Sequence, residues 1–197
     1  MKIAVVAFLP VLLAVGLPLA RAFEPVVPLP DDPKCTAEDR KFMARAMELA
    51  VTAAAHGNGA YGAVLVKNGV IIMEYDAQVT SSGDVTQHAE TGLISRASRK
   101  FGKSALADAV LYTSTEPCIM CCGSISAAGI KKFVYGVTAT QVTRLRGSKL
   151  PFKPLECREN FARRGLTDVV ILGPLMEAEG LQIHAAQIAG AQMAKAQ

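Results

Sequence analysis

Apolar residues follow a helical period in one segment of the first third of the chain. Over residues 36–56 they recur every three or four positions, as Phe42, Met43, Ala46, Leu49, Ala50 and Ala53. Thr36 and Asp39 have the spacing of a capping box, and glycines follow the last apolar position. We therefore expect an amphipathic helix over residues 36–56, with His56 capping carbonyl groups at its end rather than binding a metal.

Two short apolar runs come next, at residues 63–66 and 70–73. They flank Asn68 and Gly69, a dipeptide that tolerates positive φ at both positions and is a strong hairpin signal. The pattern predicts two antiparallel strands joined by a tight turn.

The rest of the chain alternates helical and strand-like segments. After a polar loop at residues 81–87, we expect a helix over 88–102, a strand over 110–113, a helix over 117–129, strands over 133–137 and 168–172, and a last helix over 175–195. Pro117 suits the first position of its helix, where a missing N–H costs nothing. Residues 144–159 contain prolines and basic residues, which predicts an irregular loop that covers a site, contacts a partner or is only a connection. The alternation indicates an α/β fold with a helix-covered sheet.

Residues 1–22 have the features of a secretory signal peptide. Lys2 precedes an apolar stretch, and residues 20–22 form an A-x-A cleavage site before Phe23. The alternative is an uncleaved membrane anchor, but prolines and a glycine interrupt the stretch, which barely reaches the roughly 20 residues of a bilayer span. We expect cleavage near Ala22, a periplasmic or secreted protein, and no membrane partner for the mature form.

Cleavage leaves a proline-rich leader over residues 23–34 and a domain over residues 35–197. It lowers the formal charge from +4 to +2, because Lys2 and Arg21 leave and no acidic residue does. Three short basic groups remain, at Lys131 and Lys132, at Arg144, Arg146 and Lys149, and at Arg163 and Arg164. Without a domain-wide positive field they indicate solvated surface rather than a phosphate track, so we expect no nucleic-acid partner.

The sequence contains five cysteines, of which Cys118 and Cys121 have metal-ligand spacing and Cys122 adjoins them. Cys35 and Cys157 lie far apart in the sequence. An oxidising compartment would permit a disulfide between these two, which we state as a hypothesis because sequence does not show whether their Cα atoms approach.

His88, Cys118 and Cys121 offer one imidazole and two thiolates, which fill three corners of a Zn²⁺ tetrahedron and leave the fourth for water. The two cysteines are three apart in a first helical turn, where they face one side and where the helix dipole lowers thiol pKa values. Glu90 is then free to take a proton from the water and pass it to a ring nitrogen and the departing ammonia.

A Cys-x-x-Cys pair also suits a redox disulfide or a structural metal, and a lone His-Glu pair also occurs on surfaces. The order H-x-E…P-C-x-x-C is, however, the signature of zinc deaminases. The third ligand, the remaining glutamate and Pro117 all agree with a catalytic zinc site.

Residues 87–90 (Gln-His-Ala-Glu) and 115–121 (Thr-Glu-Pro-Cys-Ile-Met-Cys) resemble the cytidine deaminase-like superfamily. The second motif is similar to the branch that holds guanine deaminases, zinc cytosine deaminases and tRNA adenosine deaminases. The resemblance implies a three-layer α/β/α sandwich around a five-stranded mixed sheet, usually as a dimer or higher oligomer, so we expect a homodimer.

The resemblance also implies roles for individual residues. His88, Cys118 and Cys121 would bind zinc, Glu90 would shuttle protons, and the Ala89 N–H would bind the substrate.

Residues 58–63 resemble the family segment that ends in Pro-Phe-Gly-Ala, with Ala60 and Tyr61 in place of Pro and Phe. Tyr61 either stacks on a base or is ordinary core, and Asn58 is a further candidate for substrate binding. Ala77 stands where many relatives have an asparagine that hydrogen-bonds the base or sugar, so polar discrimination must differ here.

We expect hydrolytic deamination of a small molecule, a free nucleobase or nucleoside, with water as co-substrate and ammonia as product. An exported enzyme meets scavenged small molecules rather than tRNA, and together with the likeness of the Thr-Glu-Pro-Cys motif this slightly favours a purine such as guanine over a pyrimidine. One alternative is a tRNA or single-stranded DNA deaminase whose N-terminus only mimics a signal. Another is a non-catalytic zinc-binding protein, which Ala77 leaves open.

Overall fold

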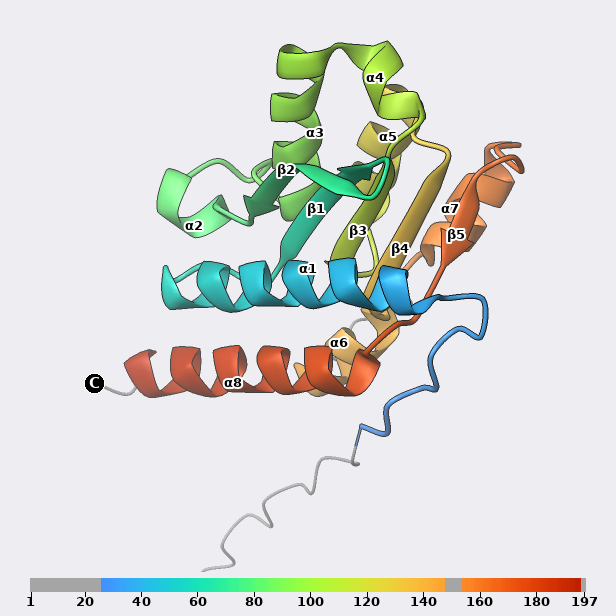
Figure 1. Cartoon of the computed structure of the whole chain (residues 1–197). Helices are drawn as coiled ribbons and strands as arrows, with labels where there is room; N and C mark the ends of the chain where they lie inside the picture. The colour runs from blue at the N-terminus through green and yellow to red at the C-terminus, as the bar shows by residue number, and fades with distance from the viewer. Residues whose placement is uncertain (1–25, 148–153, 196–197) are drawn as a thin grey trace, which may run out of the picture.

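A mixed sheet of five strands forms the centre of the fold, seen in a computed structural model that describes residues 26–147 and 154–195 (Figure 1). The strand order is β2-β1-β3-β4-β5. Strand β1 is antiparallel to β2 and β3, whereas β3, β4 and β5 are parallel. The strands are β1 (Gly62–Lys67), β2 (Val70–Asp76), β3 (Val110–Thr115), β4 (Lys132–Val137) and β5 (Val170–Leu172).

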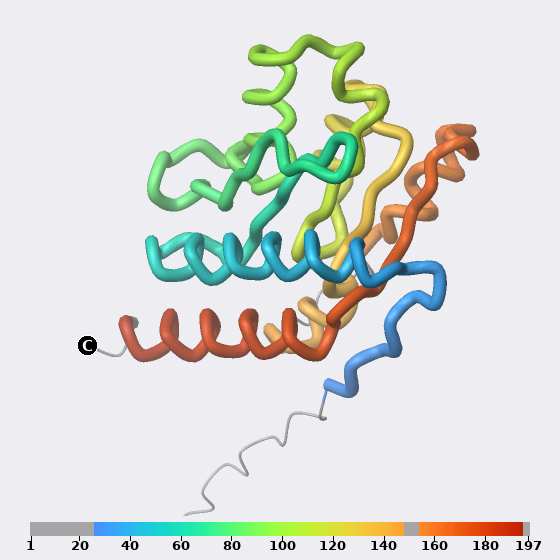
Figure 2. Tube along the Cα trace, in the orientation of Figure 1, coloured from blue at the N-terminus to red at the C-terminus, as the bar shows by residue number. Residues whose placement is uncertain are grey.

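Helices cover both faces of this sheet, which confirms the predicted three-layer α/β/α sandwich (Figure 1). One face packs against α1 (Ala37–Ala55), α6 (Ala139–Leu145) and α8 (Glu177–Lys195). The other packs against α3 (Ala89–Phe101), α4 (Lys103–Ala107), α5 (Ile119–Ala128) and α7 (Cys157–Arg163). The short α2 (Val79–Ser82) follows β2. Figure 2 shows α1 and α8 running side by side across their face.

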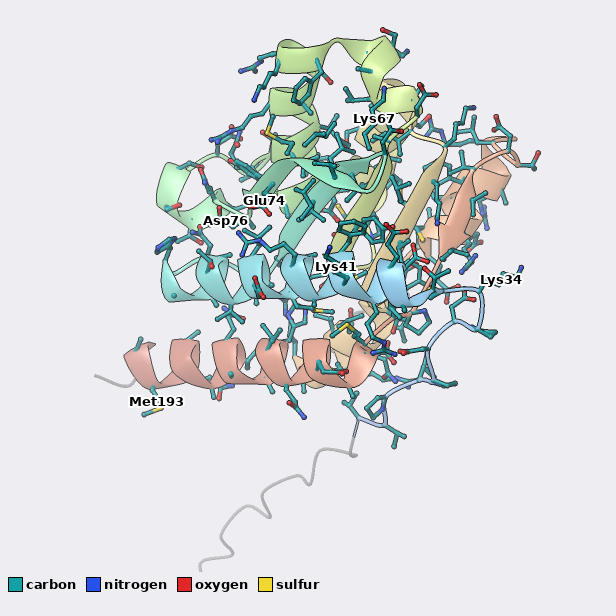
Figure 3. The ribbon with its side chains drawn as sticks, viewed as in Figure 1. Lys34, Lys41, Lys67, Glu74, Asp76 and Met193 are labelled. Carbon is teal, nitrogen blue, oxygen red and sulfur yellow. The ribbon has the colours of Figure 1, made fainter. Side chains whose placement is uncertain are left out.

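The local signals of the first elements act as predicted. The Thr36 side chain accepts from the Asp39 N–H and the Asp39 carboxylate accepts from the Thr36 N–H, so the capping box starts α1. Asn68 and Gly69 have φ values of 52° and 72°, which give the predicted hairpin turn. Glu74 lies on β2, the edge strand beside α1 (Figure 3), and accepts from Arg45 Nε and Nη2 at 2.8 and 2.9 Å.

Several boundaries differ from the prediction. Helix α5 begins at Ile119 with Cys118 as its N-cap, so Pro117 precedes the cap instead of occupying the first helical position. The last helix starts at Glu177, two residues later than expected. Short helices α2, α4, α6 and α7 also form where the sequence pattern predicted no helix, because one or two turns contain too few apolar positions to establish a period.

The proposed disulfide does not form. Cys35 packs against the core cluster beneath α1 and α8, and Cys157 is buried in the cluster on the opposite face of the sheet. Both are free thiols. The sheet stands between them, which the sequence separation did not reveal.

The N-terminal segment is tied to the domain from residue 26 onward. The Val27 carbonyl accepts from Gln141 Nε2 at 2.7 Å, and the Asp32 N–H donates to the Pro174 carbonyl at 2.8 Å. The described part of the proline-rich leader therefore packs along α6 and the start of α8. The predicted signal peptide, residues 1–22, lies outside the described residues, within which no helix combines the length and apolarity needed to span a bilayer.

Candidate zinc and active site

Two helix N-termini bring the predicted metal ligands together. His88 is the N-cap of α3 and Cys118 is the N-cap of α5, with Cys121 in the first turn of the same helix. His88 Nδ1 lies 3.7 Å from Cys118 Sγ and 3.6 Å from Cys121 Sγ, and the two sulfurs are 3.6 Å apart. Both caps leave backbone amides unpaired, which favours negative charge on the thiols.

This triangle matches one face of a zinc tetrahedron. With Zn–S bonds of about 2.3 Å and Zn–N bonds of about 2.0 Å, tetrahedral edges are about 3.8 Å between sulfurs and about 3.5 Å between sulfur and nitrogen. The three donor atoms also lie within 4.8 Å of one another as a group. His88, Cys118 and Cys121 therefore fit a zinc ion without rearrangement.

Glu90 lies beside this group, in the first turn of α3. It is 6% exposed, and its Oε2 accepts from Cys121 Sγ at 3.3 Å while its Oε1 accepts from Thr113 Oγ1 at 3.1 Å. The carboxylate is thus fixed from the sheet side by β3 and directed toward the ligand atoms.

Electrostatics in the group follow from burial and from the close sulfurs. The hydrogen bond with Cys121 lowers the pKa of Cys118 to about 4, against the opposing effect of burial. The hydrogen bond with Cys118 raises the pKa of His88. Burial raises the pKa of Glu90 above its ordinary value. The Cys118 thiolate therefore lies beside an imidazole that tends to hold a proton. A divalent cation bound here would take the place of that proton and balance the charge of the thiolate.

The site opens into a cavity of about 680 Å³, within the range of small-molecule pockets. Its wall includes His88, Glu90, Cys118 and Cys121 together with residues from several other elements: Gly59, Tyr61, Ala77, Val79, Thr80, Thr115, Glu116, Pro117, Ile119, Ala139, Val142, Thr143, Arg146, Pro154 and Leu155. Of the predicted 144–159 loop, Arg146, Pro154 and Leu155 contribute to this wall, so the segment does help to shape the pocket.

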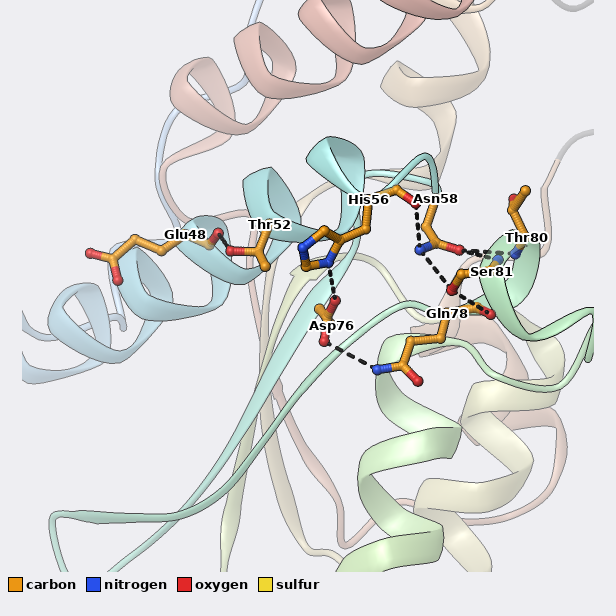
Figure 4. Close-up of polar contacts among 8 residues, drawn as sticks. All are labelled: Glu48, Thr52, His56, Asn58, Asp76, Gln78, Thr80 and Ser81. Carbon is orange, nitrogen blue, oxygen red and sulfur yellow. Dashed lines mark hydrogen bonds and ion pairs between the residues drawn. The ribbon is translucent and has the colours of Figure 1, made fainter.

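Asn58 is absent from this wall. Its Oδ1 accepts from the backbone N–H groups of Thr80 and Ser81 at 2.9 and 3.0 Å, and its Nδ2 donates to Ser81 Oγ at 3.1 Å (Figure 4). Asn58 is 2% exposed, so it is fully used in holding α2 against the end of α1. The structure therefore assigns it to positioning the pocket wall and not to contacting a ligand.

Figure 4 also shows His56, the C-cap of α1, with Nδ1 at 3.8 Å from Asp76 Oδ2. Its side chain faces the edge strand and takes no part in the metal group. The expectation that His56 lies at the helix end is confirmed, but its imidazole pairs with a carboxylate instead of carbonyl groups.

The other predicted contacts lie at or beside the pocket. Tyr61 and Ala77 line it, and the Ala77 N–H donates to the Tyr61 carbonyl at 3.0 Å. Ala89 is fully buried at the first position of α3, where its N–H has no acceptor within the helix. Cys122 is buried in the core and is not part of the pocket wall, and its thiol donates to the Pro117 carbonyl at 3.4 Å.

Sequence reasoning missed two supporting groups. Glu116 accepts from the N–H groups of Ala139 and Cys157 at 3.0 and 2.7 Å, which joins the starts of α6 and α7 to the metal motif. His184 on α8 lies 2.8 Å, through Nε2, from Thr115 Oγ1. Glu116 stood inside the recognised motif, whereas nothing near His184 in the sequence links it to the site.

Known proteins match the same region. Residues 36–137, just over half of the chain, match the family described as the cytidine and deoxycytidylate deaminase zinc-binding region. The guanine deaminase of Bacillus subtilis (strain 168) is 44% identical over 100 residues, covering 50% of this chain and 64% of the relative. The chain thus spans less than two thirds of that protein.

Two further likenesses cover more of the chain. The probable cytosine deaminase of Schizosaccharomyces pombe (strain 972) is 31% identical over 152 residues, covering 75% of this chain and 90% of the relative. A solved structure from a study of A-to-I editing by tRNA A34 deaminases has a TM-score of 0.60 and 29% identity, covering 73% of this chain and 98% of that one. By its motif, its fold and these likenesses, the chain belongs to the cytidine and deoxycytidylate deaminase zinc-binding family.

Proposed function

We propose that this protein is a zinc-dependent hydrolase that deaminates a free nucleobase or nucleoside, with guanine as the favoured ring. One observation supports this most: the three donor atoms and the buried Glu90 carboxylate meet at the wall of one cavity large enough for a small molecule. The likeness to the Bacillus guanine deaminase favours a purine.

His88, Cys118 and Cys121 would hold the zinc ion. Zinc with three protein ligands leaves a fourth coordination position for water and lowers the pKa of that water toward neutrality. Glu90 Oε2 lies 3.3 Å from Cys121 Sγ, so with zinc bound its carboxylate would be close enough to the metal group to exchange a proton with the water.

Glu90 performs the proton transfers. Its carboxylate accepts one proton from the attacking water and donates it to the ring nitrogen next to the amino-bearing carbon. After the C–O bond forms, Glu90 moves the second water proton to the amino group. The C–N bond then breaks, ammonia leaves and a ring carbonyl remains. Both protons and the oxygen of the water are then present in the two products. Thr113 holds the carboxylate in place throughout.

The Ala89 N–H is proposed to hydrogen-bond a substrate carbonyl or ring edge. It is the first amide of α3, so it lacks a helical partner and lies one residue from His88. Tyr61 is proposed as an aromatic wall for the ring.

An ammonia-release assay on the zinc-loaded protein, with a panel of bases and nucleosides, tests this function. We expect release from guanine above all, and a 10²- to 10⁴-fold lower kcat for Glu90→Gln with zinc content unchanged. Ammonia from no compound at full zinc occupancy would refute the proposal, and unchanged turnover in the variant would refute the role of Glu90.

Zinc binding has a matched pair of variants in adjacent buried cysteines. Cys121→Ser should lose tightly bound zinc, whereas Cys122→Ser should keep it, because the Cys122 thiol faces the Pro117 carbonyl. Zinc per folded protein, measured by elemental analysis, distinguishes them.

Deamination of adenosine in tRNA is a second candidate, favoured by the likeness to tRNA A34 deaminases. Including a tRNA anticodon stem-loop in the panel decides between the two. Salt-sensitive binding and inosine formation would support this candidate over the small-molecule one.

Export and assembly remain proposals that rest on the sequence. We propose cleavage near Ala22, action on scavenged small molecules outside the cytoplasm, and a homodimer. N-terminal sequencing of the exported protein and its mass in solution are the direct tests.

A further inference from the structure

Arg146 gives the pocket a cationic wall away from the metal ligands. It is the C-cap residue of α6 and lines the cavity. Of the described residues that line the cavity, it alone is a lysine or arginine. Its guanidinium makes no hydrogen bond to Glu90 or to the donor atoms within the described part of the chain.

The charge of Arg146 is not neutralised by a carboxylate of the described residues. The ion pairs found there do not include it, and Glu116, the other carboxylate at the pocket besides Glu90, is used by two backbone amides. Among residues 26–147 and 154–195, Nη2 alone of the Arg146 guanidinium nitrogens has a hydrogen-bond partner, which leaves further N–H groups that a ligand in the cavity could use.

The guanidinium is nonetheless held in place. Arg146 Nη2 donates to the Tyr61 hydroxyl at 2.6 Å, and its central carbon lies 5.7 Å from the Tyr61 ring centroid. The Tyr61 ring packs edge-on against His184 at 5.3 Å, and His184 is fixed by Thr115 at 2.8 Å. A guanidinium held this way loses less entropy when it binds a ligand than a free one.

The pair shares one cavity with the reacting groups. Tyr61 and Arg146 line the same cavity wall as Glu90 and Cys118. This arrangement suits a ligand whose ring system faces Glu90 with one edge and Arg146 with another.

The chemistry of this wall is that of a donor. Ala77 beside Tyr61 presents only a methyl group, and the guanidinium donates but never accepts. A neutral amide could hydrogen-bond either an oxo or an amino substituent. A guanidinium has only donors, so it pairs with acceptors, and its fork matches two acceptors that lie side by side. Guanine has such a pair in O6 and N7, on the side of the ring away from the amino-bearing C2, and arginine binds this edge with two parallel hydrogen bonds in nucleic-acid recognition.

We propose that Arg146, held by Tyr61, is the specificity-determining residue that binds the O6 and N7 edge of guanine while C2 faces Glu90. This deepens the proposed function and rests on it. Adenine and 2,6-diaminopurine both carry an amino donor at C6 in place of the O6 acceptor, so both are disfavoured.

Purine analogues make the test atom by atom. Zinc-loaded Glu90→Gln protein binds ligand without turnover, and calorimetry gives Kd for guanine, 7-deazaguanine (no N7 acceptor), 2-aminopurine (no O6) and 2,6-diaminopurine. We expect guanine to bind 10- to 100-fold tighter than each analogue. In the Glu90→Gln background, Arg146→Met should raise the Kd of guanine by the same factor and change the Kd of 2-aminopurine by no more than about threefold.

Arg144→Met is the matched control. Arg144 is on the same helix, its guanidinium donates to Gln141 Oε1 and it is absent from the pocket wall, so its removal should change no Kd. Equal weakening of all four purines by Arg146→Met would overturn the inference, as would no detectable binding of guanine. Guanosine 5′-monophosphate is measured as a fifth ligand: if Arg146→Met weakened its binding and not that of guanine, the inference would also be overturned, because the arginine would then bind phosphate.

The two proposals fail separately. If no ring releases ammonia but guanine still binds through Arg146, the catalytic proposal is refuted and the recognition proposal holds. If guanine is deaminated and the Arg146 variant retains the wild-type preference, the reverse is true.

Discussion

Burial of His184 should make the stability of this protein depend on pH in a defined window. The imidazole is 1% exposed on the inner side of α8. Nε2 is paired with Thr115 Oγ1, and Nδ1 has no partner among the described residues. The edge of Tyr61 and the positive charge of Arg146 face it, and the described ion pairs give it no carboxylate. This environment holds the neutral imidazole.

The magnitude follows from the shift in pKa. Burial first, and Arg146 second, lower the pKa of His184 from 6.5 to about 4. Between these values the unfolded chain binds a proton that the folded protein does not, so the histidine favours unfolding increasingly as pH falls. Full stability is present above pH 6.5 and about 3 kcal/mol is lost by pH 4, where the folded form also becomes protonated.

The assay compares wild type with His184→Gln, which keeps a hydrogen-bonding group for Thr115 and does not titrate. Urea unfolding of both zinc-loaded proteins is measured at intervals from pH 7.5 to pH 4. Carboxylate protonation and zinc loss affect both proteins, so the difference between their free energies of unfolding isolates the histidine. It should change by about 3 kcal/mol in favour of the variant as pH falls. A difference that stays constant across this range would refute the buried, neutral state of His184.

Two further predictions concern packing around the site. Glu116→Ala should lower the free energy of unfolding by about 2–4 kcal/mol, because the Ala139 and Cys157 amides lose their acceptor, and Glu116→Gln should lose less; urea unfolding measures both. Gly62→Ala should cost more than about 2 kcal/mol, since its Cβ would lie 2.3 Å from the Ala46 carbonyl oxygen and force α1 away from β1. Gly123→Ala, with open space at its Cβ within α5, should instead stabilise by about 0.5–1 kcal/mol, and equal effects of the two alanines would contradict this packing.

The sequence by itself determined the elements and chemistry that short-range patterns encode. The capping box of Thr36, the Asn68 and Gly69 turn and the long apolar periods depend on residues within a few positions of one another, so local physics fixes them. The metal ligands also belong here. Although His88 and Cys118 are 30 residues apart, each lies in a motif whose internal spacing specifies the chemistry.

Tertiary structure alone decided which side chains from distant elements lie at the pocket and which lie away from it. Asn58 proved to be an anchor for α2, and Cys35 and Cys157 lie on opposite faces of the sheet. Arg146 lines the pocket from the end of α6, and His184 on α8 lies behind the wall, against Thr115 and Tyr61. Their positions depend on how helices pack across a sheet, where rotating a helix about its axis by half a turn moves a side chain from solvent to the site. No spacing along the chain records that rotation, because it is set by the summed packing of side chains from both layers.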